Sequence, residues 1–292
     1  MSANNFPTAA GLASSAAGYA CLVASLANLY GVEDTELSSI ARVGSGSACR
    51  SVYGGWVRWT MGVEADGSDS VASQVAPAEH WPEMQILILV VNSGKKEVSS
   101  STGMQDSVRT SDLIDHRAKV VVPARMKAIE AAIQAKDFNT FGEITIKDSN
   151  QFHACCLDTY PPIFYLNDNS RHIIQLMSRY NAYHGTVKAA YTFDAGPNAV
   201  IYCLKDDVQE ILGLVNTYLP NATAPEDGEG FYRGLSTEAP ADSALSAEIK
   251  EKIGMPSVTD GIKYVLHTAP GPGPIVTKDT LMTAEGMPIS SE

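Results

Sequence analysis

The segment that most constrains the fold is Ser14–Tyr30, with the sequence SSAAGYACLVASLANLY. Its residues favour a helix, it opens on two hydroxyl residues suited to helix capping, and it stops at Gly31. Because this helix is apolar nearly all round, we expect other elements to bury it. The chain should therefore form a packed domain around this segment.

The composition indicates a globular protein and excludes several classes of function. The 292 residues suggest one large domain or two ordinary ones, and 45% of them are apolar. A formal net charge of −12 argues against a nucleic-acid-binding protein, which requires a basic surface. The longest apolar run, Ile86–Val91, is far shorter than the roughly 20 residues that span a bilayer. Since the first residues also lack a signal-peptide pattern, we expect a soluble cytoplasmic protein that binds no membrane.

The thiol and imidazole side chains do not have the spacing of a metal site. The five cysteines are odd in number, form no CxxC pair and are predicted to be buried thiols in a reducing compartment: Cys21, Cys49, Cys155, Cys156 and Cys203. None of the six histidines has metal-ligand spacing with another, so we assign them no role.

Alternating helical and strand patterns predict an α+β fold. Helices are expected at Ser14–Tyr30, Thr35–Arg42, Gln105–Ala135 (with a possible break at Pro123), Phe138–Phe152, Ser170–Tyr183 and Val208–Tyr218. Strands are expected from Trp56 to Trp59 and at Met84–Val91, Val187–Asp194, 198–204 and 262–270. We place a domain boundary near Pro82, which divides the chain into residues 1–82 and 83–292. Residues 221–247, rich in Asp, Glu, Gly, Pro and Ala, are predicted to be an acidic surface insertion.

The first candidate site is the stretch FPTAAGLASSAAG, in which Gly11, Leu12, Ala13, Ser14 and Ser15 lead directly into the first helix. Gly11 allows a close approach of the backbone, and a helix N-terminus offers unpaired N–H groups and partial positive charge to a phosphate. The pattern is not a Walker A loop, because no Lys-Ser/Thr follows a second glycine. The alternative is a simple turn that caps a buried helix.

The second candidate site is GSGSACR, which contains Ser45, Ser47 and Arg50. The glycines could let the backbone form an anion-binding nest, the hydroxyls could donate to oxygens, and Arg50 offers a bidentate fork to a carboxylate or phosphate. A dinucleotide-binding interpretation fails, because Cys49 replaces the third glycine and no strand precedes the segment. The alternative is a flexible loop with a solvated arginine.

The third candidate is Asp194 in YTFDAGPNA, where a carboxylate ends an apolar strand and precedes a tight turn. This position suits a general base, although an aspartate that caps its own turn is the common alternative. A weaker candidate is Ser100 in KKEVSSSTGMQ, since anions often bind between a strand and a helix.

Together these motifs resemble a known family. FPTAAGLASSAAG is similar to the phosphate-binding motif of the GHMP kinase superfamily, and Pro7, Gly11, Leu12, Ser14, Ser15 and Ala16 match it. GSGSACRS and YTFDAGPNA narrow the resemblance to the eukaryotic diphosphomevalonate decarboxylases and disfavour a sugar or mevalonate kinase. The resemblance runs from Ser2 to about Leu219. It implies a partial GHMP N-terminal domain followed by a ferredoxin-like C-terminal domain.

The resemblance also implies a reaction and roles for residues. The family uses ATP, accompanied by Mg²⁺, to convert (R)-5-diphosphomevalonate into isopentenyl diphosphate, ADP, phosphate and CO₂ for isoprenoid and sterol synthesis. Asp194 matches the base or orienting group at the C3 hydroxyl, and Arg50 matches the ligand of the substrate carboxylate. Ser45 and Ser47 match substrate-binding serines, and Ser100 matches a serine that contacts substrate or nucleotide phosphate. The ATP phosphate loop corresponds to Gly11, Leu12, Ala13, Ser14 and Ser15. Family members are usually homodimers.

One departure from the family concerns the start of the chain. The resemblance implies further strands, an adenine pocket and a lysine before the phosphate motif, and none of these is present in the 292 residues. We therefore expect this chain alone to fold poorly and to lack turnover, and a version extended upstream to be active. A catalytically inactive binding or interaction protein on the same scaffold remains the alternative function.

Overall fold

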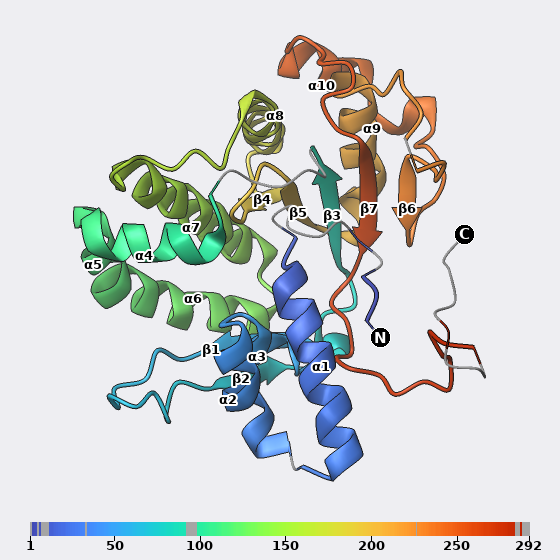
Figure 1. Cartoon of the computed structure of the whole chain (residues 1–292). Helices are drawn as coiled ribbons and strands as arrows, with labels where there is room; N and C mark the ends of the chain where they lie inside the picture. Colours follow the sequence, from blue (N-terminus) through green and yellow to red (C-terminus); the bar gives the residue numbers. More distant parts are fainter. Residues whose placement is uncertain are drawn as a thin grey trace. The chain divides into compact units, whose positions relative to one another are not determined.

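The computed structural model describes residues 2–4, 6, 12–32, 34–91, 98–225, 227–283 and 287. Two compact units emerge (Figure 1), the first from Met1–His80 with Gly271–Glu292, and the second from Trp81–Pro270. A single boundary was expected near Pro82, whereas the contacts also place the chain after Pro270 with the first unit. In that unit the Gly55 amide donates to the Gly271 carbonyl at 2.8 Å.

The first unit consists of short helices and one small sheet. Its elements are α1 (Ser14–Tyr30), α2 (Asp34–Gly44), α3 (Ala48–Ser51), β1 (Trp56–Trp59) and β2 (Ala72–Ala76). The helix Ser14–Tyr30 and the strand Trp56–Trp59 were both predicted with these bounds. Strand β2 was not predicted, because its five residues, ASQVA, carry little strand signal alone; it forms by antiparallel pairing with β1.

Helix α1 is buried on one side only, which corrects the expectation that it is covered all round. Ala20, Val23 and Ala27 pack into a small core with residues of α2 and α3. Its other side exposes large apolar side chains, with exposed fractions from 43% to 75%: Tyr19, Leu22, Leu26, Leu29 and Tyr30. Cys21 is exposed as well, so the prediction of buried thiols is wrong for this cysteine, while the other four are buried.

The second unit is built on a five-stranded sheet in the order β4-β5-β3-β7-β6. Its strands are β3 (Met84–Val90), β4 (Ala190–Phe193), β5 (Ala199–Leu204), β6 (Tyr232–Gly234) and β7 (Tyr264–Thr268). Strands β4, β5, β3 and β7 are antiparallel neighbours in the sheet. Along the chain they follow the βαββαβ, ferredoxin-like arrangement. Strand β6 adds to the edge in parallel with β7. The predicted α+β class and ferredoxin-like unit are therefore confirmed.

The rest of the second unit is largely helical. Its helices are α4 (Ser100–Thr110), α5 (Asp112–His116), α6 (Val122–Ala135), α7 (Phe138–Asp158), α8 (Asp168–His184), α9 (Val208–Tyr218) and α10 (Ala247–Ile253). Of these, α7, α8 and α9 pack on the sheet, and other helices pack on these three. The expected long helix Gln105–Ala135 is divided, since Ser111 has an extended backbone and Arg117–Val121 form a π-type turn. Pro123 is the second residue of α6 and directly follows this π-type turn.

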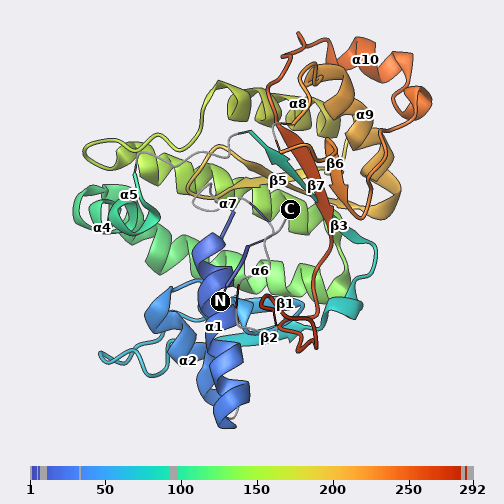
Figure 2. The same cartoon turned by 45° about the vertical axis from the view of Figure 1, so that its right-hand side comes forward.

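The main core lies between the sheet and the helices α8 and α9. Leu87 and Ile201 of the sheet pack there with Leu176 and Leu212 of the helices, and all four are fully buried. Neighbouring residues of a strand point to opposite faces, so Tyr202 points away from the core that contains Ile201. Its ring centre lies 5.4 Å from that of Phe141 in α7. Helix α7 therefore covers the other face at β4 and β5 (Figure 2).

The segment 221–247 is more than a surface insertion. It supplies β6, and its Tyr232 and Leu245 belong to the main core, with exposed fractions of 8% and 4%. The acidic and glycine-rich composition conceals these few core residues, which the periodicity of so short a strand does not reveal. No helix in the described parts of the chain is long and apolar enough to cross a membrane.

Candidate active site

The start of α1 has the properties of an anion-binding helix N-terminus. Ala13 precedes the helix with a left-handed backbone, φ 56° and ψ 33°, and no side chain caps the first turn. The first turn contains no acidic residue. A left-handed alanine costs about 1–3 kcal/mol, a strain that is found at ligand-binding sites. Leu12 and Ser14 are half-buried and Ser15 is exposed, while Gly11 lies outside the described residues.

The structure brings the first two candidate segments together. The Ser15 hydroxyl of α1 lies 3.3 Å from the Ser45 hydroxyl in the turn between α2 and α3. Residues 15 and 45 are 30 positions apart in sequence, so this pairing depends on packing of the helices. A phosphate at the start of α1 would meet hydroxyls from both segments.

The glycines of GSGSACR serve close packing, which corrects the expectation of a backbone nest. Neither Gly44 nor Gly46 has a positive φ, whereas a nest requires alternating right- and left-handed residues. A Cβ on Gly44 would lie 2.3 Å from the Tyr19 ring, and one on Gly46 would lie 3.0 Å from the Trp59 ring. These glycines therefore allow the serine-bearing turn to approach α1 and β1.

Arg50 is an exposed side chain with a defined orientation. It lies in α3, for which Ser47 is the residue before the first turn, and its guanidinium carbon is 5.6 Å from the centre of the Trp59 ring. The indole N–H of Trp59 donates to the Ser70 hydroxyl at 3.0 Å, which holds the ring in place. A guanidinium above a fixed indole keeps its donors available to a carboxylate or phosphate.

Asp194 is an exposed carboxylate on a rigid turn in the second unit. It follows the last residue of β4, and its carbonyl accepts the Gly196 amide at 2.7 Å. The Ser170 hydroxyl at the start of α8 donates to the Pro197 carbonyl at 2.9 Å. The buried side chain of Asn198 accepts the Val91 amide at 2.8 Å. The backbone is thus fixed while the carboxylate faces solvent.

Helix α7 braces the residue that precedes Asp194. The Ser149 hydroxyl accepts the Phe193 amide at 3.1 Å, and Nε2 of His153 lies 3.3 Å from the Phe193 carbonyl. Burial lowers the pKa of His153, an effect partly offset by the Phe193 carbonyl and the charge of Asp194. A neutral imidazole with Nε2 protonated donates to this carbonyl.

Ser100 lies in the first turn of α4. The neighbouring Ser99 caps this helix and accepts the Thr102 amide at 3.1 Å. Ser100 is half-buried and therefore only partly accessible to a ligand. Lys95 and Lys96, which precede it in the same motif, lie outside the described residues.

The candidate residues thus divide between the two units. Ser15, Ser45, Ser47 and Arg50 belong to the first unit, and Ser100 and Asp194 to the second. No role was expected for His153, although Ser149 and His153 have the i, i+4 spacing that places both on one face of a helix. No group of three or more His, Cys, Asp or Glu residues that could hold a metal ion occurs in the described part of the chain.

The chain combines a ferredoxin-like sheet unit with a Gly-Ala-Ser motif that leads into a helix. This combination is typical of a GHMP-kinase-type protein. A family model for the mevalonate 5-diphosphate decarboxylase C-terminal domain matches residues 86–277. A second model, for the diphosphomevalonate decarboxylase-like N-terminal domain, matches residues 1–72. The chain therefore belongs to the diphosphomevalonate decarboxylase family.

Individual relatives agree with this assignment. Diphosphomevalonate decarboxylase of Rattus norvegicus is 54% identical over 290 residues, which cover 98% of this chain and 71% of the relative. The structure of mevalonate diphosphate decarboxylase from Trypanosoma brucei matches with a TM-score of 0.83 and 39% identity, covering 92% of this chain and 70% of that one. The structure of MDDEF in complex with MVAPP, AMPPCP and magnesium matches with a TM-score of 0.64 and 34% identity. The match covers 73% of this chain and 64% of that one.

Proposed function

We propose that this protein carries out the ATP-dependent decarboxylation of (R)-5-diphosphomevalonate to isopentenyl diphosphate, ADP, phosphate and CO₂, with turnover expected in a version extended upstream. The observation that carries the proposal is the setting of Asp194, an exposed carboxylate on a turn fixed by buried hydrogen bonds. Such a group is available to a ligand, because its backbone is held without using its carboxylate oxygens. Family membership identifies the reaction.

The two groups of residues are assigned different roles. Asp194 accepts or orients the proton of the substrate's C3 hydroxyl, which prepares that oxygen for phosphorylation. Arg50 binds the substrate carboxylate and orients it for loss as CO₂, while Ser45, Ser47 and Ser100 donate to substrate oxygens. Phosphoryl transfer depends mainly on such positioning and on stabilisation of charge.

The start of α1 fits a nucleotide phosphate. Its uncapped first turn without acidic residues and the exposed Ser15 hydroxyl would bind the phosphates of ATP. Mg²⁺ would accompany the nucleotide and neutralise charge on the transferred group. The related MDDEF complex contains AMPPCP and magnesium, which supports the use of both here. A homodimer in the cytoplasm completes the proposal, by resemblance to the family.

The proposal is tested by measuring CO₂ and ADP release from purified protein with ATP, Mg²⁺ and diphosphomevalonate. The 292-residue chain is assayed beside a version that carries the upstream coding sequence. Stoichiometric CO₂ and ADP in either form support the proposed reaction. Binding of an ATP analogue without release of CO₂ in both forms would favour the alternative of an inactive binding protein.

Arg50 provides a sharper test of the site. Arg50→Ala removes a charge-assisted contact to the carboxylate, so we expect kcat/KM for diphosphomevalonate to fall roughly 30-fold or more, equivalent to about 2 kcal/mol. The affinity for ATP should change little. Arg50→Lys keeps the charge without the planar fork and should recover only part of the activity. Near-normal kcat/KM in Arg50→Ala would remove this residue from the site.

A further inference from the structure

Tyr165 connects two parts of the second unit that carry proposed site residues. It lies between α7 and α8, is 8% exposed, and belongs to a small buried cluster with Cys156, Ile163 and Ala195. Ala195 immediately follows Asp194 in the chain. The aromatic ring therefore belongs to the packing that supports the Asp194 turn.

The hydroxyl of Tyr165 reaches the start of α4. It donates to the Ser99 carbonyl at 3.3 Å, directly before Ser100. The contact is close, because a Cβ added to Gly103 in the same helix would lie 2.4 Å from this hydroxyl oxygen. A glycine at position 103 thus makes room for the phenol, and the first turn of α4 rests on it.

The phenol keeps its proton throughout the physiological pH range. Burial, together with the nearby Cys156 and Asp194, raises the pKa of Tyr165 to about 12. The side chain is consequently a permanent donor to the Ser99 carbonyl. The hydroxyl thus lies at the start of α4, while the ring packs with Ala195, the residue after Asp194.

We propose that Tyr165 is a positioning residue, which fixes the first turn of α4 with Ser100 relative to the Asp194 turn. The inference rests on the proposed function, in which one end of the substrate meets Ser100 and its C3 hydroxyl meets Asp194. Small errors in such placement reduce the rate of chemistry more than they reduce binding. Tyr165 therefore acts on kcat through the two residues that it aligns.

The test is a double-mutant cycle of Tyr165→Phe and Gly103→Ala, with kcat and KM measured for both substrates. Tyr165→Phe should lower kcat about tenfold, a fraction of the roughly 100-fold loss caused by a 1 Å misplacement, and leave KM for ATP unchanged. Gly103→Ala forces the methyl group against the hydroxyl and should lower kcat at least as much. Removal of the hydroxyl relieves the severe contact, because the nearest remaining atoms are Cδ1 of Ile163 at 3.3 Å, the end of a flexible side chain, and Cζ of Tyr165 at 3.5 Å. The double variant should therefore resemble Tyr165→Phe alone.

Ser107→Ala is the matched control. The Ser107 hydroxyl lies 2.7 Å from that of Thr159, so this bond also ties α4 to the end of α7, but one helical turn beyond Gly103. The control should lower stability and leave kcat near the wild-type value. Wild-type kcat in Tyr165→Phe, or an equal loss of kcat in Ser107→Ala, would overturn the proposal.

Hydrogen exchange provides a readout that needs no turnover. In Tyr165→Phe, faster exchange should appear in residues 100–104 and 194–199 and not in α9. Unchanged exchange in both segments would overturn the proposal even if the wild-type protein has no decarboxylase activity. A wild-type protein without activity but with this exchange pattern would contradict the proposed reaction alone.

Discussion

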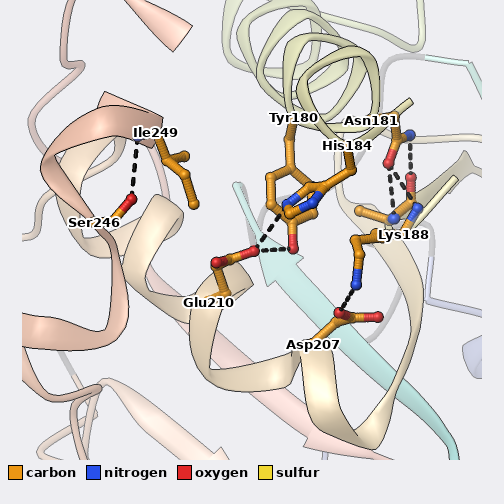
Figure 3. Close-up of polar contacts among 9 residues, drawn as sticks. Tyr180, Asn181, His184, Lys188, Asp207, Glu210, Ser246 and Ile249 are labelled. Atoms are coloured by element: carbon orange, nitrogen blue, oxygen red, sulfur yellow. Dashed lines mark hydrogen bonds and ion pairs between the residues drawn. The ribbon is translucent and has the colours of Figure 1, made fainter. Parts of the chain in front are cut away.

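Two carboxylates of the second unit, Asp194 and Glu210, show how the same chemical group is used in different ways. Glu210 lies in the first turn of α9, where one oxygen accepts the Tyr180 hydroxyl at 2.7 Å and lies 3.0 Å from Nε2 of His184 (Figure 3). Asp194 is exposed, and hydrogen bonds hold its backbone rather than its carboxylate. The comparison indicates that Glu210 stabilises the fold, whereas Asp194 is available for chemistry.

The surroundings of Glu210 strengthen this contrast. Nearby, Lys188 forms an ion pair with Asp207 (Figure 3). The Asn181 side chain forms hydrogen bonds with the backbone of Lys188 and Ala189. These contacts join the end of α8 to the segments before β4 and α9. Burial is the main cause of a raised pKa of Tyr180, and the hydrogen bond to Glu210 adds to it. The Tyr180 hydroxyl therefore remains a donor.

The largest expected effect is that of Asp194→Asn on catalysis. Asparagine keeps the shape of the side chain but cannot take a proton, so kcat should fall roughly 100-fold or more. The melting temperature and the affinity for ATP should stay close to wild type. Activity above a few per cent, measured as CO₂ release, would mean that the carboxylate only caps its turn and would break the comparison.

The next largest effect is that of Glu210→Ala on stability. The substitution leaves the Tyr180 hydroxyl without its acceptor, and we expect the free energy of unfolding to fall by about 1–3 kcal/mol in urea titrations. Glu210→Gln keeps one acceptor oxygen and should lose less. Both variants should keep wild-type kcat at temperatures well below their melting point. A selective loss of kcat with unchanged stability would reverse the roles assigned to the two carboxylates.

The smallest effect concerns pH and the histidine beside the Asp194 turn. Burial lowers the pKa of His153, His172 and His267 in the folded chain. Histidines of the unfolded chain have the ordinary pKa of about 6.5, so below this pH the unfolded chain binds more protons than the folded chain. The free energy of unfolding is therefore highest above about pH 6.5 and falls as the pH falls toward 5. Urea titrations at pH 7.5, 6.5 and 5.5 measure the slope. His153→Gln should make it shallower, and an unchanged slope would show that folding does not lower the pKa of His153.

Local patterns were sufficient for the elements whose own residues carry a strong capping or apolar signal. The helix Ser14–Tyr30 has hydroxyls at its start and a glycine at its end, and Val208–Tyr218 has a periodic apolar face; both were predicted with the bounds of α1 and α9. The strand Met84–Val91 was recognised because a continuous β-branched run is typical of a buried strand. Strands β2 (ASQVA) and β6 (YRG) could not be predicted, since they are short, carry little strand signal of their own and form by pairing with β1 and β7.

The sequence by itself determined the chemistry that is present: the phosphate-type motif before α1, the serines and arginine of residues 44–50, and the aspartate at a strand end. Only the tertiary structure decided how these groups are used. It paired Ser15 with Ser45, left one side of α1 exposed, and braced the Asp194 turn from α7 and α8. The physical reason is that propensity and capping act over a few residues, whereas burial and long-range hydrogen bonds depend on which elements pack together.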